Sequence, residues 1–217
     1  MDGSTAPLKP RLRGVSHQYA FFVAVVLGAV LVFRARGTGG TIATAIYACG
    51  ICGLFGVSAL YHRVTWPPRA RAWMRRLDHS MIFVFIAASY TPVAVLVLDD
   101  RLATIVLAVV WGGALAGVIL KLVWITAPRW LSALLYVALG WVAVTTIPTL
   151  WSTLGWLAVG AFGLGGLLYT AGAVVYALRR PDPWPRVFGY HEIFHALVIA
   201  AAALHFAAIA LAIVPRG

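Results

Sequence analysis

The chain has 217 residues, of which 62% are hydrophobic and only 11% are charged, and its mean hydropathy is +0.92. A soluble domain of this length cannot bury so much apolar surface, so the composition excludes a soluble globular protein. The formal net charge of +11 would suit a nucleic-acid-binding protein if the chain were soluble. In an apolar chain, the distribution of that charge has to be examined first. The composition indicates an integral membrane protein.

Seven apolar segments follow one another along the chain, and each is about long enough to cross ~30 Å of hydrocarbon as a helix. The segments cover residues 16–33, 41–62, 78–98, 103–123, 130–150, 154–178 and 189–214. Gly113 and Gly117 have the small-xxx-small spacing that allows membrane helices to pack closely. The sequence therefore predicts an all-α membrane protein. We expect a basic cytoplasmic tail over residues 1–15 and a single seven-transmembrane-helix bundle over residues 16–214.

Lysine and arginine are divided unevenly between the two sides of the predicted bundle. If successive loops alternate between the sides, thirteen of these residues fall on the side of the N-terminus and four on the other. Positive residues stay on the cytoplasmic side during insertion, so we expect a cytoplasmic N-terminus and an outer C-terminus. Topology then explains the net charge without a nucleic-acid partner. The expected location is the plasma membrane, the inner membrane of the cell, with the lipid bilayer as the partner.

The seventh segment begins with H-E-x-x-H, which places His191 and His195 four residues apart. On a helix they project from one face, so both ring nitrogens can reach a single ion. The predicted topology brings His62, at the end of the second segment, to the same membrane side. Three histidine nitrogens with an open fourth position are typical of catalytic zinc, which acidifies a bound water molecule. Asp78, which begins the third segment, is the candidate to accept that proton. Ser58, one turn from His62, could hydrogen-bond a ligand, the water or an oxyanion.

Other interpretations of the same residues remain open. H-E-x-x-H is also a zinc-metalloprotease signature, in which Glu192 would be the general base. However, Glu192 lies about 100° around the helix from His191, so it could instead face the cytoplasmic rim or a basic loop. Polar residues near helix ends also occur simply as headgroup-level anchors. A retinal protein is excluded, because its Schiff base needs a lysine in the last helix and the only lysines are Lys9 and Lys121.

Three sequence blocks resemble the signature blocks of the hemolysin III family. They are S-A-L-Y-H at 58–62, R-L-D-H-S at 76–80 with S-Y-T-P at 89–92, and F-G-Y-H-E-I-F-H at 188–195. The resemblance spans essentially the whole chain and extends to a superfamily with the progestin and adipokine receptors and, more distantly, the alkaline ceramidases. It implies seven helices, a cytoplasmic N-terminus and zinc near the cytoplasmic side. By resemblance, His62, His191 and His195 hold the zinc, Asp78 binds the zinc water and Ser58 lies close by.

The activity that the resemblance implies is hydrolysis. The superfamily members with the closest chemical logic hydrolyse lipid amides such as ceramides, so we expect a zinc-dependent membrane hydrolase of a lipid amide or ester. One alternative is a hemolysin-like or receptor-like membrane protein in which zinc is structural. The other is the intramembrane metalloprotease that H-E-x-x-H suggests. The sequence names neither the substrate nor a protein partner.

Three further histidines are expected to have structural roles. His79 follows Asp78 and is expected to point away from it on the helix, so we do not count it as a ligand. His205 lies about 15 Å deeper than His195 at ~1.5 Å per residue, too far to share an ion. We expect it to be a buried hydrogen-bonding histidine or to line a cavity, and His17 has the same status.

Two other patterns concern helix geometry and redox chemistry. Cys49 and Cys52 form C-x-x-C, but they lie within an apolar helix, so we do not expect a redox or metal role. Pro92 and Pro148 are expected to kink or end the third and fifth helices. Such kinks could open a cavity large enough for a lipid.

Overall fold

The computed structural model describes residues 9–216, so residues 1–8 of the predicted tail lie outside the described part. Among these described residues, seven helices are long and apolar enough to cross a membrane, which confirms the predicted all-α seven-helix fold. In chain order the elements are α1 (Val15–Arg34), α2 (Gly37–Arg63), α3 (Pro68–Val97), α4 (Asp100–Val123), α5 (Arg129–Gly140), η1 (Trp141–Thr146), α6 (Ile147–Leu154), α7 (Trp156–Leu178), α8 (Tyr190–Ala208), η2 (Ile209–Ile213) and η3 (Val214–Arg216). The fifth span consists of α5, η1 and α6, and the seventh consists of α8 with the π-helical η2.

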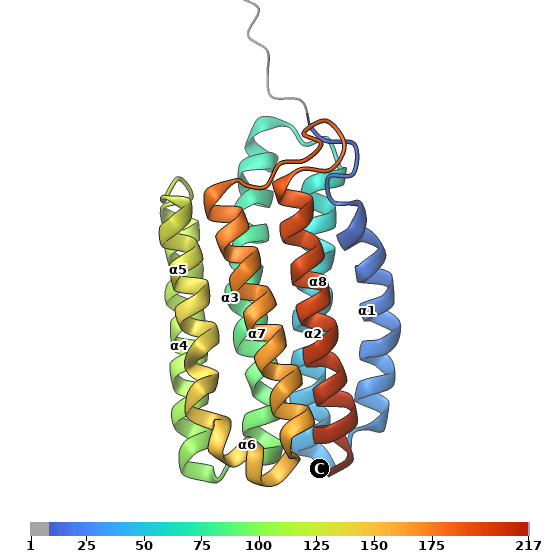
Figure 1. The fold of residues 1–217 in the computed structure, drawn as a ribbon, viewed down its shortest axis with the longest axis vertical. Coiled ribbons are helices and arrows are strands. Elements are labelled where there is room, and N and C mark those ends of the chain that lie inside the picture. Colours follow the sequence, from blue (N-terminus) through green and yellow to red (C-terminus); the bar gives the residue numbers. More distant parts are fainter. Residues whose placement is uncertain (1–8, 217) are drawn as a thin grey trace, which may run out of the picture.

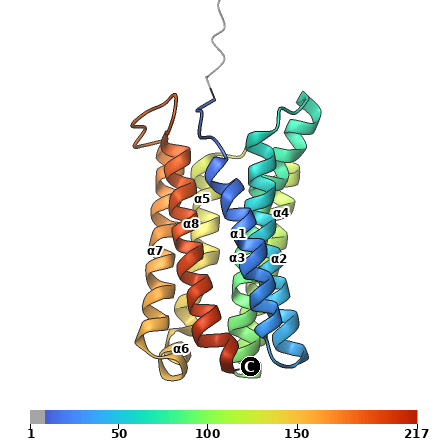
Figure 2. The same ribbon diagram turned by 90° about the vertical axis from the view of Figure 1, so that its right-hand side faces the viewer.

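The bundle has two distinct ends (Figures 1 and 2). At one of them α2 ends at Arg63, α3 begins at Pro68 and α8 begins at Tyr190, and we call it the histidine end. The N-terminal segment and the connection between α7 and α8 lie there, whereas the C-terminus lies at the opposite end (Figure 2). The thirteen lysines and arginines counted above belong to the histidine end. Their number predicts that this end faces the cytoplasm.

The third span begins earlier than its hydropathy indicates. We expected it to start at Asp78, but α3 starts at Pro68, so Asp78 lies ten residues inside a continuous helix. Proline suits the first helical position, because its φ is already helical and an N–H at that position would have no partner within the helix. The first turns of α3 carry several arginines and extend beyond the apolar segment. Hydropathy marks only the part of a helix within hydrocarbon, so it missed this extension.

The fifth span is interrupted near its middle. It changes from α5 to the 3₁₀ segment η1 at Trp141, and η1 ends just before Pro148, which lies in the first turn of α6. Proline has no N–H and clashes with the preceding turn, which explains the break. The Tyr90 hydroxyl donates to Gly140 O at 2.5 Å and accepts from Ala143 N–H at 2.7 Å. Backbone groups freed at membrane depth need such partners. Pro92, in contrast, lies inside α3 and does not end it.

Close packing around α4 depends on its glycines, as their spacing predicted. A Cβ atom on Gly117 would lie 2.4 Å from the ring of Phe83 on α3, and one on Gly113 would lie 2.6 Å from Leu139 on α5. The Phe83 ring leaves room only for glycine at position 117, whereas the tip of Leu139 can move aside, so the close approach of α4 depends mainly on Gly117. A cavity of about 230 Å³ nevertheless remains inside the bundle, between α3, the fifth span, α7 and α8.

Candidate metal centre

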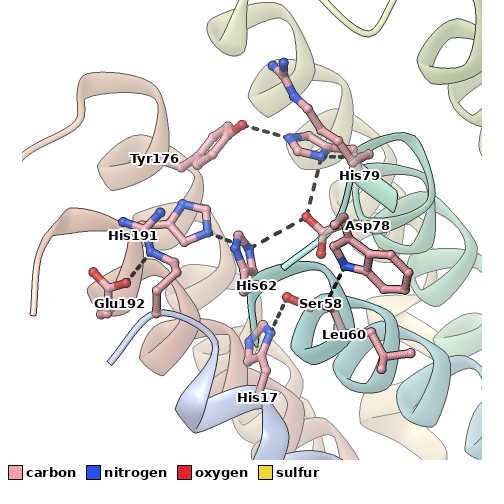
Figure 3. A network of polar contacts seen from close by, with 12 residues as sticks. His17, Ser58, Leu60, His62, Asp78, His79, Tyr176, His191 and Glu192 are labelled. Carbon is pink, nitrogen blue, oxygen red and sulfur yellow. Dashed lines mark hydrogen bonds and ion pairs between the residues drawn. The ribbon is translucent and has the colours of Figure 1, made fainter. Parts of the chain in front are cut away.

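Three histidines meet at the histidine end of the bundle. His62 comes from the last turn of α2, and His191 and His195 lie one turn apart in the first two turns of α8. One ring nitrogen from each lies within 4.8 Å of the others, and His62 Nε2 is 3.1 Å from His191 Nε2 (Figure 3). All three residues are buried. The structure thus brings together the histidines that the sequence selected.

The spacing of two of these nitrogens matches that of neighbouring metal ligands, and the third lies within 4.8 Å of both. At zinc–nitrogen distances of ~2.0–2.1 Å, tetrahedral ligands lie about 3.3 Å apart, close to the 3.1 Å between His62 and His191. His195 Nδ1 is buried without a hydrogen-bond partner. A buried nitrogen left unpaired in this way is costly unless a ligand satisfies it. Within residues 9–216, no other group of three or more histidines, cysteines or acids has the arrangement to hold a metal.

Asp78 lies beside this cluster without being part of it. Its Oδ2 is 4.0 Å from His62 Nε2, beyond hydrogen-bonding distance, and its side chain is only 12% exposed. A gap of this size suits a bridging water molecule. Ser58 is buried one turn before His62, and its hydroxyl also interacts with the Asp78 carboxylate. Both residues therefore lie within reach of a water held at the histidines.

The prediction that His79 points away from Asp78 is wrong. His79 Nδ1 donates to Arg75 O at 2.8 Å and lies 3.5 Å from Asp78 Oδ2, while the Tyr176 hydroxyl donates to His79 Nε2 at 3.1 Å. Neighbouring side chains leave a helix about 100° apart, but both of these are long enough for their tips to converge. Figure 3 shows this contact beside the histidine cluster. Tyr176 belongs to no sequence motif, so no pattern indicated it.

His17 also lies closer to the site than we expected. Its ring stacks on that of His195, with centroids 3.7 Å apart and an angle of 6° between the planes. Its Nδ1 is 2.9 Å from Ser58 Oγ (Figure 3). The sequence did contain an indication, because α1 begins on the same predicted membrane side as the other histidines. That topology places His17 at the right depth but does not show which face of α1 turns towards the cluster.

Glu192 has contacts that differ from those of a general base. It is 3% exposed and forms an ion pair with Arg13 of the N-terminal segment. Its other carboxylate oxygen accepts from Gly189 N–H at 2.8 Å, which caps the start of α8. The Glu192 carboxylate is therefore paired with a basic segment of the chain, which is close to the alternative of a basic loop considered above. These contacts count against the metalloprotease interpretation of H-E-x-x-H.

The cavity connects the site with the interior of the bundle. Asp78 and His191 line it at the histidine end, and Leu150 and His205 line it at greater depth. His205 Nε2 donates to Phe162 O at 3.1 Å and His205 lines the cavity, as the sequence suggested, but the residue is half-buried rather than buried. Most of the remaining lining is apolar. The arrangement combines a polar mouth with an apolar interior.

The two cysteines stand apart from this centre. Cys49 is exposed and Cys52 is half-buried, and both are free. Neither belongs to the histidine cluster.

Comparison with known proteins agrees with the sequence blocks. The chain is 26% identical over 204 residues to Hemolysin-3 of Bacillus cereus, covering 93% of this chain and 90% of that one. It is 29% identical over 161 residues to the Hemolysin-3 homolog of Bacillus subtilis strain 168, covering 74% and 72%. It is 27% identical over 220 residues to the human monocyte to macrophage differentiation factor, covering 94% and 88%. A protein-family profile described as "Haemolysin-III related" matches residues 5–206. The chain therefore belongs to the haemolysin-III-related family and is a multi-pass membrane protein.

Proposed function

We propose that this protein binds zinc through His62, His191 and His195 and hydrolyses a lipid amide or ester. The observation that carries the proposal is the convergence of three buried ring nitrogens within 4.8 Å at the mouth of a largely apolar cavity. Imidazole ligands in this number and with an open position favour catalytic zinc. Other divalent metals also accept imidazole, so metal identity is part of the test.

Asp78 is the proposed proton acceptor. When bound, a zinc ion in such a site lowers the pKa of water and polarises a carbonyl group. The Asp78 carboxylate lies near the cluster, where it can accept a proton from the attacking water and pass it to the leaving group. The side chains of His79 and Ser58 lie next to this carboxylate, and the single hydroxyl proton of Ser58 can be donated either to it or to the developing oxyanion.

The cavity supports a lipid as the substrate. Its volume of about 230 Å³ is below the ~300–1,000 Å³ of pockets that enclose a whole drug-sized ligand. We therefore expect it to hold one alkyl chain and to leave the polar headgroup at the histidine end. Bacterial relatives and the positive charge of that end favour the plasma membrane, with the histidine end in the cytoplasm.

The first test is metal analysis of purified protein. We compare the wild type with His191→Ala and with His205→Ala, which removes a half-buried histidine far from the cluster. The wild type and His205→Ala should each contain about one zinc per chain, and His191→Ala should lose it, as expected for a three-ligand site. Wild-type protein without zinc, or His191→Ala that keeps it, would overturn the proposal.

The second test is lipid hydrolysis followed by mass spectrometry. Asp78→Asn should keep its zinc but lose turnover by roughly 10²–10⁴-fold, the usual contribution of a general base. If Glu192→Gln has that effect instead, the metalloprotease interpretation gains support. If no lipid amide or ester is cleaved while removal of zinc loosens the bundle, the metal is structural, as in the receptor-like alternative.

A further inference from the structure

We infer that His17 is a positioning residue of the metal centre, holding the ring of His195 by stacking and the hydroxyl of Ser58 by a hydrogen bond. This inference rests on the proposed function, because it assigns a role towards the metal ligands. His17 lies in the first turn of α1, far in sequence from H-E-x-x-H, and is only 3% exposed. The sequence alone indicates only a structural role for it.

Residues of two other helices contact the His17 ring. One face lies parallel to the His195 ring, with centroids 3.7 Å apart. Phe55 of α2 lies at a tilt, with its centroid at 5.1 Å. The Nδ1 atom is 2.9 Å from Ser58 Oγ. The ring is thus restrained by α2 and α8 together.

The stacking geometry argues against His17 as a fourth ligand. A ring nitrogen binds a metal along its lone pair, which lies in the plane of the ring. The planes of His17 and His195 are parallel within 6° and stacked. An ion in the plane of His195 therefore lies outside the plane of His17. His17 can support the site while the fourth coordination position stays open for water or substrate.

His195 needs such support. Metal-binding histidines almost always donate their second ring N–H to an acceptor, which fixes the orientation of the ring. His195 Nδ1, the nitrogen left open for the metal, is buried and unpaired. No hydrogen bond from the other ring nitrogen to a described residue holds the ring either, so rotation about the Cβ–Cγ bond has to be limited by packing. The parallel ring of His17 supplies that restraint.

The N-terminal segment is built to bring His17 to this position. Gly14, just before α1, has φ +78°, and a Cβ atom there would lie 2.5 Å from His62 Cβ. Only glycine combines this conformation with so close an approach. Arg13 is tied to Glu192 of α8, and Arg11 N–H donates to Arg186 O at 3.0 Å. These contacts fix the start of α1 against both helices that carry the ligands.

Two substitutions separate the stacking from the hydrogen bond. His17→Phe keeps an aromatic ring for His195 but loses the nitrogen that contacts Ser58. His17→Asn keeps a polar atom at a comparable position but loses the ring. The matched control is His205→Asn, which removes a half-buried imidazole from α8 away from the cluster. Zinc affinity is measured by competition with a chromophoric chelator, and ligand geometry by the visible spectrum of the cobalt-substituted protein.

His17→Asn should weaken zinc binding roughly 10–100-fold and change the cobalt spectrum, as loss of an outer-shell contact does. His17→Phe and His205→Asn should bind zinc like the wild type, while His17→Phe lowers the hydrolysis rate through Ser58. Equal zinc affinity and equal cobalt spectra for His17→Asn and the wild type would overturn the inference. So would a loss of zinc affinity in His17→Phe as large as that in His17→Asn. So would a loss of helix content in metal-free His17→Asn, because the ring would then support the bundle. A wild type that binds neither zinc nor cobalt refutes the proposed function itself.

Discussion

The ion pair between Arg13 and Glu192 allows a quantitative test of how the N-terminal segment is attached. Glu192 is 3% exposed, and the Arg13 side chain is 20% exposed. Removing one partner of a buried pair costs about 3–5 kcal/mol, and the partial access of water to Arg13 reduces this to about 2 kcal/mol. Glu192→Gln keeps an acceptor for the Gly189 N–H, so it should lower the free energy of unfolding by about 2 kcal/mol. Glu192→Ala also loses the cap and should cost about 1 kcal/mol more.

The assay is unfolding in detergent micelles, followed by far-ultraviolet circular dichroism during titration with a denaturing detergent. A double-mutant cycle with Arg13→Met should give a coupling energy of about 1.5–3 kcal/mol, the range for charge-assisted hydrogen bonds. Asp182→Asn is the matched control, because Asp182 Oδ1 accepts from Tyr190 N–H at the same helix start but is exposed. It should change stability by less than about 0.5 kcal/mol. If Glu192→Gln keeps full stability and zinc but loses turnover, Glu192 acts on water and our assignment is refuted.

Three further predictions concern packing, metal and topology. Gly117→Ala should lower the free energy of unfolding by roughly 1–3 kcal/mol, because its Cβ atom would lie 2.4 Å from a buried ring; Gly112→Ala, with no atom within 4 Å, should not. A chelator should lower the thermal midpoint of the wild type but not of His191→Ala, because only a protein that binds metal gains stability from it. In a background without native cysteines, Asp100→Cys should react with a membrane-impermeant thiol reagent in intact cells, and Trp184→Cys should not. Equal effects within any of these pairs would contradict the corresponding assignment.

Much of the fold could be predicted because the membrane imposes a length on each element. A helix needs about 20 apolar residues to cross the hydrocarbon, so hydropathy located all seven spans. It could not locate helix that lies outside hydrocarbon, such as the first ten residues of α3 before Asp78. Pro148 indicated a disturbance in the fifth span. Only the structure shows that a 3₁₀ segment precedes Pro148. Tyr90 contacts the backbone of this segment, and the segment lines the cavity.

The candidate site was predicted in part for a related reason. The i, i+4 spacing of His191 and His195 places both on one helix face, and the alternation of the loops brings His62 to the same depth. Depth and helix face are properties of one segment at a time, so they can be inferred from the chain. The convergence of His17, His79 and Tyr176 depends on which faces of α1, α3 and α7 turn towards the cluster.

By itself, the sequence determined that this is a seven-helix membrane protein with His62, His191 and His195 at one end of the bundle. Hydrophobic length and charge asymmetry set the position of each helix along the membrane normal, and they act on each segment separately. Only the tertiary structure decided how the helices are rotated and which are neighbours. Those choices depend on close packing between segments distant in the chain, such as Gly117 against Phe83 and His17 against His195. They turn a set of histidines at one depth into a cluster of three with a stacked fourth.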